Sequence, residues 1–192
     1  IACRKGHVDA ARLLLDKGAD VRAMENVGTP LYAACLAGRV DAARLLLEYG
    51  ADMNQPMCDS STPLFIGCQQ GNVEVARLLL GKGAEVDRAM VGGVTPLYIA
   101  CQFGHIDAAQ LLLEHGAEVD RAMEIGATPL YIACAYGHVD AVRLLLEKGA
   151  EVNRAAEDGS TPLSIAKSQG HSPIVALLEE HKSSKSRGAA ES

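Results

Sequence analysis

A tetrad of Thr-Pro-Leu and an aromatic residue recurs along this chain every 33 residues, as from Thr29 to Thr62. Further copies begin at Thr95 and Thr128, and a fifth at Thr161 has serine in the fourth place. A fixed period of this size indicates a stack of similar units, each of which contacts only its neighbours. Over 192 residues it predicts about six units. A stack has no central cavity, so we expect its function to depend on an extended surface.

Each unit is predicted to contain two short helices, as the fourth unit illustrates. The hydroxyl of Thr95 is suited to cap a helix, and Pro96 suits the first helical position because its missing N–H has no partner there anyway. Gly104 is expected to end this helix in the left-handed conformation. A second helix is expected over residues 106–115. The turn-rich segment 117–127 is expected to project as a β-hairpin, here called a finger.

Packing between units must stabilise these helices, because they are shorter than the ~12–15 residues at which isolated helices become marginally stable. Each buried leucine contributes ~1.5–3 kcal/mol. A Leu-Leu-Leu block recurs at 13–15, 45–47, 78–80, 111–113 and 144–146. Since aromatic residues are only 4% of the chain, the core must consist mainly of aliphatic side chains.

Composition argues against several classes of partner. A net charge of −6 is unfavourable for nucleic acid, whose binding depends on neutralising phosphates with lysine and arginine. The longest uncharged apolar runs are far shorter than the ~20 residues of a membrane helix. Because the chain opens at Ile1 inside a repeat, without an initiator methionine, we expect the true N-terminus to be missing.

Four cysteines lie one period apart, at Cys35, Cys68, Cys101 and Cys134, and Cys3 fits the same place in the first unit. Stacked helices lie ~8–10 Å apart, which exceeds the ~4.4–6.8 Å between the Cα atoms of a disulfide. Close pairs of the Cys-x-x-Cys kind, typical of zinc sites, do not occur. These cysteines are therefore predicted to be buried free thiols, with Cys58 exposed in a loop. Free thiols favour a reducing, cytoplasmic location.

No pattern in the chain predicts catalysis, and we expect no cofactor and no metal. Four histidines, at His7, His105, His138 and His171, recur after a glycine in the turn between the two helices, which indicates a structural role. A phosphate-binding Gly-x-x-x-x-Gly-Lys-Ser/Thr loop is absent from the sequence. The charged side chains of the second helices, such as Asp140, Arg143 and Glu147, are interpreted as a solvated outer face.

The chain resembles the ankyrin repeat family over residues 1–181. The resemblance rests on Thr-Pro-Leu-x-x-Ala, Gly-His-x-Asp and Leu-Leu-Leu-x-x-Gly-Ala-x-Val-Asn/Asp, which occur in order at 128–134, 137–140 and 144–153. It implies an all-α, slightly curved solenoid of stacked helix-turn-helix units with short β-hairpin fingers. It also implies protein–protein recognition through the fingers and the inner helices of the concave side, without catalytic residues.

The repeat boundaries are expected near 1–25 (partial), 26–58, 59–91, 92–124, 125–157 and 158–181, the last being a C-terminal cap. In this last unit Lys167 replaces the core cysteine and Glu179 breaks the leucine block, which is how a solenoid protects an exposed end. Residues 182–192 are rich in serine, lysine and glycine, so we expect a disordered tail. The finger that begins at Val21 is one residue short and is expected to be distorted.

Two departures from the family pattern concern the interface between units. The residue after Thr-Pro-Leu, commonly histidine in the family, is here aromatic in four units, as at Tyr98, and is expected to fill more volume between units. The finger position commonly held by aspartate carries Met24, Met57, Met90, Met123 and Ala156.

Mapping the recognition positions of the family onto this chain predicts a partner-binding surface around units four and five. Its residues are Arg88, Met90, Gln102, Phe103, Arg121, Met123, Tyr136 and Arg154. Exposed aromatic rings beside arginine and adaptable methionine are typical of binding hot spots. The expected occupant is an extended or helical peptide, apolar with some acidic residues.

Each group in this surface also has a purely structural interpretation. The methionines would pack finger against finger, and the arginines would pair with Glu85, Glu118 and Glu151 nearby. The rings of Phe103 and Tyr136 would tuck against the next unit.

The leading hypothesis is a monomeric, non-enzymatic protein-interaction module. One alternative is a targeting or regulatory ankyrin segment of a larger enzyme, such as a kinase or a ubiquitin ligase component. Another is a metal or redox sensor that uses the row of cysteines. Asn54 and Asn153 occupy a finger position that is hydroxylated in some ankyrin relatives, and the sequence leaves their modification open.

Overall fold

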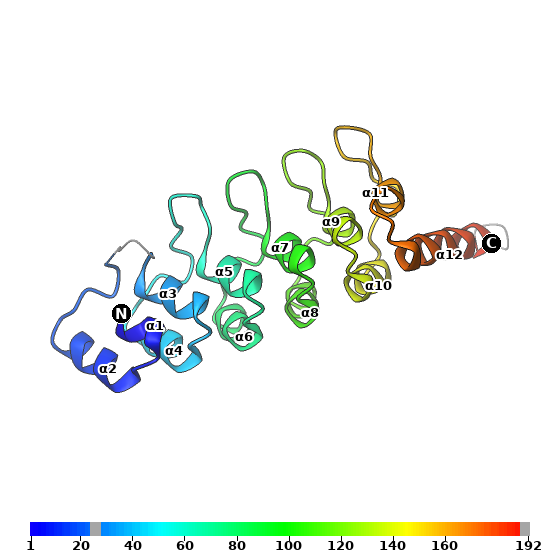
Figure 1. Cartoon of the computed structure of the whole chain (residues 1–192). Coiled ribbons are helices and arrows are strands. Elements are labelled where there is room, and N and C mark those ends of the chain that lie inside the picture. The colour runs from blue at the N-terminus through cyan, green and yellow to red at the C-terminus, as the bar shows by residue number, and fades with distance from the viewer. Residues whose placement is uncertain (24–27, 189–192) are drawn as a thin grey trace.

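The computed structural model describes residues 1–23 and 28–188, over which twelve helices follow one another in pairs. The helices are α1 (Ala2–Lys5), α2 (Val8–Asp16), α3 (Pro30–Leu36), α4 (Val40–Glu48), α5 (Pro63–Gln69), α6 (Val73–Gly81), α7 (Pro96–Phe103), α8 (Ile106–Glu114), α9 (Pro129–Tyr136), α10 (Val139–Glu147), α11 (Pro162–Ser168) and α12 (Ser172–Gly188). Figure 1 shows the pairs side by side in one row, with the fingers projecting along one edge. This arrangement confirms the predicted solenoid.

The start of five inner helices, α3, α5, α7, α9 and α11, follows from a Thr-Pro dipeptide. The threonine hydroxyl accepts a hydrogen bond from the backbone N–H three residues ahead, and the proline takes the first helical position. For Thr95 the acceptor lies 3.1 Å from the nitrogen of Tyr98. Thr95 and Thr128 are themselves buried, so this cap satisfies a helix end where water is excluded.

Inner helices stack on inner helices and outer helices on outer helices. Thus α7 contacts α5 and α9, while α8 contacts α6 and α10. One continuous hydrophobic core runs between the two rows, from Leu31 to Leu178. It is composed mainly of leucine, alanine, valine, isoleucine and cysteine, as the low aromatic content predicts.

The residue that follows the turn glycine joins each unit to the one before it. His138 Nε2 lies 2.9 Å from the carbonyl oxygen of Gln102, at the end of the preceding inner helix. The same bond recurs at His105, His171 and, through its amide, Asn72. A Cβ on Gly104 would lie 2.6 Å from His138 Nδ1, so the glycine also makes room for the imidazole. His105, His138 and His171 therefore have the structural role that their position predicts.

The fingers are tight loops rather than β-hairpins with paired strands. The turns from Met57 onward are each closed by two backbone bonds, such as Met90 N–H to the Val94 carbonyl at 3.0 Å and Gly93 N–H to the Met90 carbonyl at 3.1 Å, and the described residues contain no extended strand. Neighbouring fingers are joined by one further backbone bond, as from Glu124 N–H to the Gly92 carbonyl at 2.9 Å. The loops have too few residues between their turns to form a ladder. Residues 24–27, including Met24 in the shortened finger, lie outside the described residues.

A side chain at the base of each finger makes a further link between units. Asn54 Oδ1 accepts from the Glu85 N–H at 3.1 Å, and Asp87 and Asp120 accept from the equivalent N–H one unit later. Burial raises the pKa of Asp87, and its Oδ1 is buried without a hydrogen bond. Asn54, one of the two positions that are hydroxylated in some relatives, is thus part of a structural contact.

The last unit ends the stack with polar side chains. Lys167 Nζ lies 2.9 Å from Glu179 Oε1, so the two polar substitutions of this unit form an ion pair with each other. On the other side of α12, Ile174 and Leu178 are buried against the preceding pair.

The C-terminal helix is longer than the sequence predicts. Helix α12 continues to Gly188, so residues 182–188 are helical, contrary to the expectation of a disordered tail from residue 182. Extending a helix that packing has already nucleated costs far less than starting one, which explains how a polar segment continues it.

Candidate functional site

The inner helices and the fingers form one face of the solenoid, and two aromatic rings are exposed on it. Phe103 and Tyr136 are the last residues of the neighbouring helices α7 and α9, and are 49% and 55% exposed. Gln102 Nε2 donates to the Tyr136 hydroxyl at 3.3 Å, which links the two helices at this point. We call Gln102, Phe103 and Tyr136 the α7–α9 patch.

Each exposed ring of this patch rests on the histidine of its own unit. The ring centroids of Phe103 and His105 are 6.2 Å apart, and those of Tyr136 and His138 are 6.4 Å apart, with the planes nearly parallel in both pairs. The histidines are in turn fixed by their bonds to the preceding unit. The rings are therefore backed on one side and open on the other, rather than tucked against the next unit.

Further tyrosines lie beneath this patch, toward the fingers. Tyr98 is only 5% exposed, and burial raises its pKa to about 12, with smaller contributions from the nearby hydroxyls of Tyr136 and Tyr131. The Tyr131 hydroxyl lies 3.0 Å from Ser160 Oγ. As predicted, Tyr98 fills volume between units.

Two of the three candidate arginines are paired within their own finger. Arg88 Nη1 lies 3.2 Å from Glu85 Oε1, and Arg121 Nη1 lies 3.3 Å from Glu118 Oε1. The structural alternative, pairing with Glu85 and Glu118, is therefore the one that these two arginines adopt, because the turn brings residues three apart together. The pairs are exposed to solvent, so each contributes less than about 1 kcal/mol. Arg154 instead donates to the Asp120 carbonyl at 3.0 Å.

The finger methionines pack at least partly within the protein. A Cβ placed on Gly28 would lie 2.5 Å from Met57 Sδ and 3.1 Å from Tyr32 Cδ1, so Met57 lies close to the preceding finger and to the aromatic ring of its own unit. Met90 and Met123 are half-buried. This geometry supports packing between units for Met57, and partner contact by Met90 and Met123 stays a prediction.

Two exposed apolar side chains at the tips of the fingers were not predicted from the sequence. Val91 is 65% exposed and Ile125 is 54% exposed. Both adjoin a glycine with positive φ, Gly92 and Gly126, which marks the tip of the loop. The glycine that follows each residue, Gly92 or Gly126, is the sequence feature that could have indicated its exposed position.

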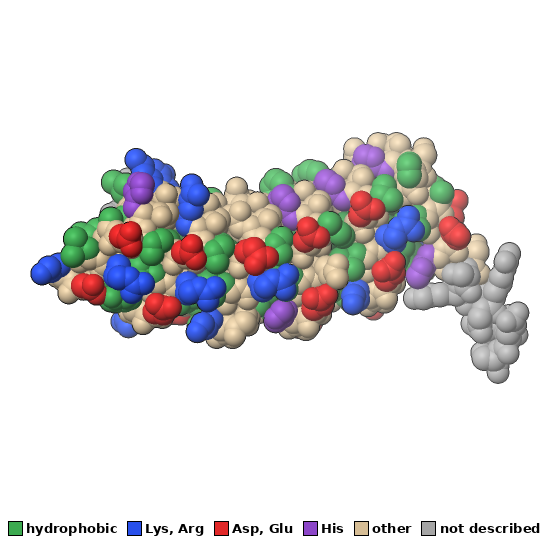
Figure 2. All heavy atoms as spheres, turned by 90° about the horizontal axis from the view of Figure 1, so that it is seen from below, with side chains coloured by type: hydrophobic (Ala, Val, Ile, Leu, Met, Phe, Trp, Pro, Cys, Tyr) green, Lys and Arg blue, Asp and Glu red, His purple; other side chains and the backbone are tan. Residues whose placement is uncertain are grey.

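The outer helices present a face with mixed charges. Figure 2 shows acidic and basic side chains interspersed along it. The one ion pair between described side chains of these helices, Arg77 with Glu74 at 3.7 Å, is long and exposed. This face fits the predicted solvated surface and offers no patch of a single charge.

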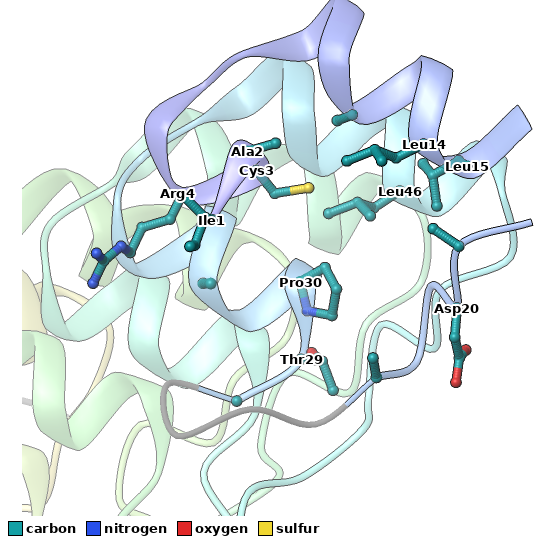
Figure 3. Close-up of a pocket in the computed structure, with 15 residues that line it drawn as sticks. Ile1, Ala2, Cys3, Arg4, Leu14, Leu15, Asp20, Thr29, Pro30 and Leu46 are labelled. Carbon is teal, nitrogen blue, oxygen red and sulfur yellow. The ribbon is translucent and has the colours of Figure 1, made fainter. Parts of the chain in front are cut away.

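A cavity of about 670 Å³ lies at the first unit, bounded by aliphatic side chains and Cys3. In Figure 3, Leu14, Leu15 and Leu46 lie along one side of it, while Arg4 points away. Leu14 is 55% exposed, whereas the equivalent leucines in the next four units, Leu46, Leu79, Leu112 and Leu145, are buried by their neighbours. The cavity is therefore an uncovered stacking face rather than a site with its own chemistry.

The repeated cysteines are free thiols, buried in four units and half-buried at Cys3. Burial raises the pKa of Cys68, Cys101 and Cys134 to about 12 in each case. The described residues contain no group of three or more cysteine, histidine or acidic side chains placed to hold a metal ion.

Thiol labelling of the native protein tests this burial. We expect Cys58, which is exposed, to react quickly with a chromogenic disulfide reagent, while Cys68, Cys101 and Cys134 react only as the protein unfolds. Because their pKa values lie near 12, mildly alkaline pH does not generate the reactive thiolate, so the slow phase stays slow there. Rapid native labelling of any of these three cysteines would favour the redox-sensor alternative instead.

Within the described part of the chain, none of the helices combines the length and the apolar character needed to cross a membrane.

A family model of ankyrin repeats in three copies matches residues 1–57, 53–123 and 122–188. No curated protein sequence matches the chain significantly. Since the matched segments span nearly the whole array of helix pairs, the chain belongs to the ankyrin repeat family.

Proposed function

We propose that this chain is a non-enzymatic binding module that captures a partner protein through its concave face, centred on the α7–α9 patch. Ankyrin repeats are in general protein–protein interaction modules. The observation that carries the finer proposal is the pair of exposed rings, Phe103 and Tyr136, held on successive inner helices. Around the patch, the proposal includes Arg88, Met90, Arg121, Met123 and Arg154.

The geometry of the patch favours a protein partner. Large rings that are backed on one side lose little freedom on binding, which is why such residues carry much of the energy of protein interfaces. The net charge of −6 is unfavourable for nucleic acid. The free thiols fit a reducing compartment, and we place the module in the cytoplasm on that ground.

The pairing of the arginines changes what the partner has to offer. Arg88 and Arg121 already form ion pairs with Glu85 and Glu118. They therefore favour acidic residues in the partner less strongly than unpaired arginines would. Recognition at the patch then depends mainly on apolar side chains. The proposed ligand is an extended or helical peptide segment that inserts an apolar residue between the rings of units four and five.

Replacing Phe103 and Tyr136 together with alanine is expected to reduce capture of the partner by at least about tenfold, because hot-spot truncations cost ~2 kcal/mol or more. The melting temperature is expected to change little, since both side chains are about half exposed. The measurement is a pull-down with the intact chain, followed by titration of the retained protein against each variant.

The matched control uses the same positions in units three and six, Gln70→Ala with Gln169→Ala, which are exposed at the ends of α5 and α11. This double variant is expected to capture the partner as the unmodified chain does. Undiminished capture by the Phe103 and Tyr136 variant would remove the α7–α9 patch from the proposal.

A further inference from the structure

The row of finger methionines is broken in one unit. Met57 packs close to Tyr32 of its own unit, and the corresponding aromatic residue in the unit of Ala156 is Tyr131. Phe65 and Tyr98, in the units of Met90 and Met123, are 3% and 5% exposed, whereas Tyr131 and Tyr32 are both half-buried. An alanine methyl group is too short to cover the ring, so Ala156 leaves space above Tyr131.

The structure has a pocket of about 380 Å³ at this place, between the fingers of units four and five. It is lined by Ile125, Tyr131, Ala156, Glu157 and Asp158. Its apolar walls are the side chain of Ile125, the ring of Tyr131 and the methyl group of Ala156. The other two lining residues are acidic.

Hydrogen bonds hold the lining of this pocket in place. Asp158 Oδ1 accepts from both the backbone N–H and the hydroxyl of Ser160, and these bonds hold the pKa of Asp158 below its usual value. The Ser160 hydroxyl lies 3.0 Å from that of Tyr131. Glu157 N–H donates to the Ile125 carbonyl at 3.0 Å, which joins the two fingers. The pocket is thus preorganised in the absence of a ligand.

The charges around the pocket are negative. Both hydrogen bonds between Asp158 and Ser160 use Oδ1, and Glu157 joins the neighbouring finger through its backbone, so carboxylate oxygens of both residues are available to a ligand. Arg154, on the same finger, donates to the carbonyl of Asp120 at the base of the preceding finger. A ligand that combines an apolar stem with a cationic end fits this lining.

We propose that this pocket binds an arginine side chain of the partner protein. The methylene stem would cover Ile125 and Ala156, the planar guanidinium would stack on the Tyr131 ring, and its N–H groups would donate to Glu157 and Asp158. The planar, delocalised guanidinium suits this combination of ring and carboxylates better than the compact ammonium group of lysine does. The inference rests on the proposed function in assigning the arginine to a partner protein.

The test uses the full chain with isotope-labelled isoleucine and alanine methyl groups, and Nα-acetyl-arginine amide as the probe. Saturable shifts of the methyl signals of Ile125 and Ala156 are expected. The control probe is Nα-acetyl-citrulline amide, which has nearly the same shape without the charge, and it is expected to bind at least about fivefold more weakly. Equal binding of the two probes, or no saturable shift with arginine, would overturn the inference.

Two variants test the lining of the pocket. Ala156→Met restores the row of methionines, so it is expected to abolish the arginine-induced shift of Ile125 without lowering the melting temperature. Glu157→Gln is expected to weaken arginine binding about threefold, whereas Glu147→Gln, the same change on the outer helix α10, leaves it unchanged. If Ala156→Met fails to fold, the comparison with the citrulline probe and the Glu157→Gln variant still decide whether the pocket binds arginine.

The outcome for the pocket is separable from the outcome for the α7–α9 patch. Arginine binding is expected to survive in the variant with alanine at Phe103 and Tyr136, because neither residue lines the pocket. If that variant loses the partner while the arginine probe never binds, the pocket inference fails and the proposed function stands. If the arginine probe binds but partner capture is independent of the rings, the proposed function fails and the pocket stands as a site.

Discussion

Replacing Leu112 with alanine is expected to lower the free energy of unfolding by about 3–5 kcal/mol, whereas the same change at Leu14 is expected to cost less than about 1 kcal/mol. The two residues are the middle members of Leu-Leu-Leu blocks in different units. Leu112 is 0% exposed within α8, while Leu14, beside the open face in Figure 3, is 55% exposed. The comparison keeps the residue and its local sequence nearly constant and changes only whether a neighbouring unit covers it.

Urea-induced unfolding of the two variants, followed by circular dichroism, measures this difference. A large loss at Leu112 alone shows that cohesion is supplied between units, as expected for a stack in which each unit contacts its neighbours. Similar losses at both positions would contradict the burial pattern. A change in the slope of the transition for either variant would show that the array no longer unfolds as one cooperative body.

Replacing Gly93 with alanine is expected to cost about 2–3 kcal/mol, compared with about 1 kcal/mol for its neighbour Gly92. Both glycines have positive φ, +79° and +87°, so alanine is strained at either position. They differ in what surrounds them. A Cβ on Gly93 would lie 2.9 Å from the backbone nitrogen of Glu124, whereas a Cβ on Gly92 would meet nothing within 4 Å.

The difference between the two glycine variants isolates the close approach of one finger to the next. Because the clash at Gly93 involves backbone rather than a flexible side chain, the fingers must move apart to relieve it. Thermal or urea unfolding gives the two stabilities, and exchange of the Glu124 amide hydrogen reports the bond to Gly92 that the movement would weaken. Equal destabilisation by the two substitutions would show that backbone strain alone matters and that the fingers are not tightly joined.

The repeat units were predictable because their signals are local and recur. From α3 onward, a Thr-Pro pair marks the start of each inner helix and a glycine lies at or just after its end, as at Thr95 and Gly104 in α7. Because the pattern repeats every 33 residues, the same positions of helices and finger are predicted in the other units. The burial of the cysteine row also followed from spacing, since side chains at one place in the repeat share one environment.

The contacts between fingers were less predictable, because they depend on the path of the backbone in three dimensions. The pairing of Arg88 with Glu85 was one of two open alternatives, and only the turn geometry decides between them. The extension of α12 depends on cooperative propagation, which composition does not report. The sequence shows that Ala156 departs from the row of methionines. That this departure leaves space beside Tyr131 follows only from the structure, which places Met57 beside Tyr32.

Site-specific photo-crosslinking tests the central claim most directly, since it reports which face of the stack contacts the captured partner. A benzophenone amino acid replaces either Tyr136, on the inner helix α9, or Glu147, on the outer helix α10; both positions are exposed. If the concave face captures the partner, the partner is expected to crosslink from position 136 and not from position 147. Crosslinking from position 147 alone, or equally from both, would contradict it.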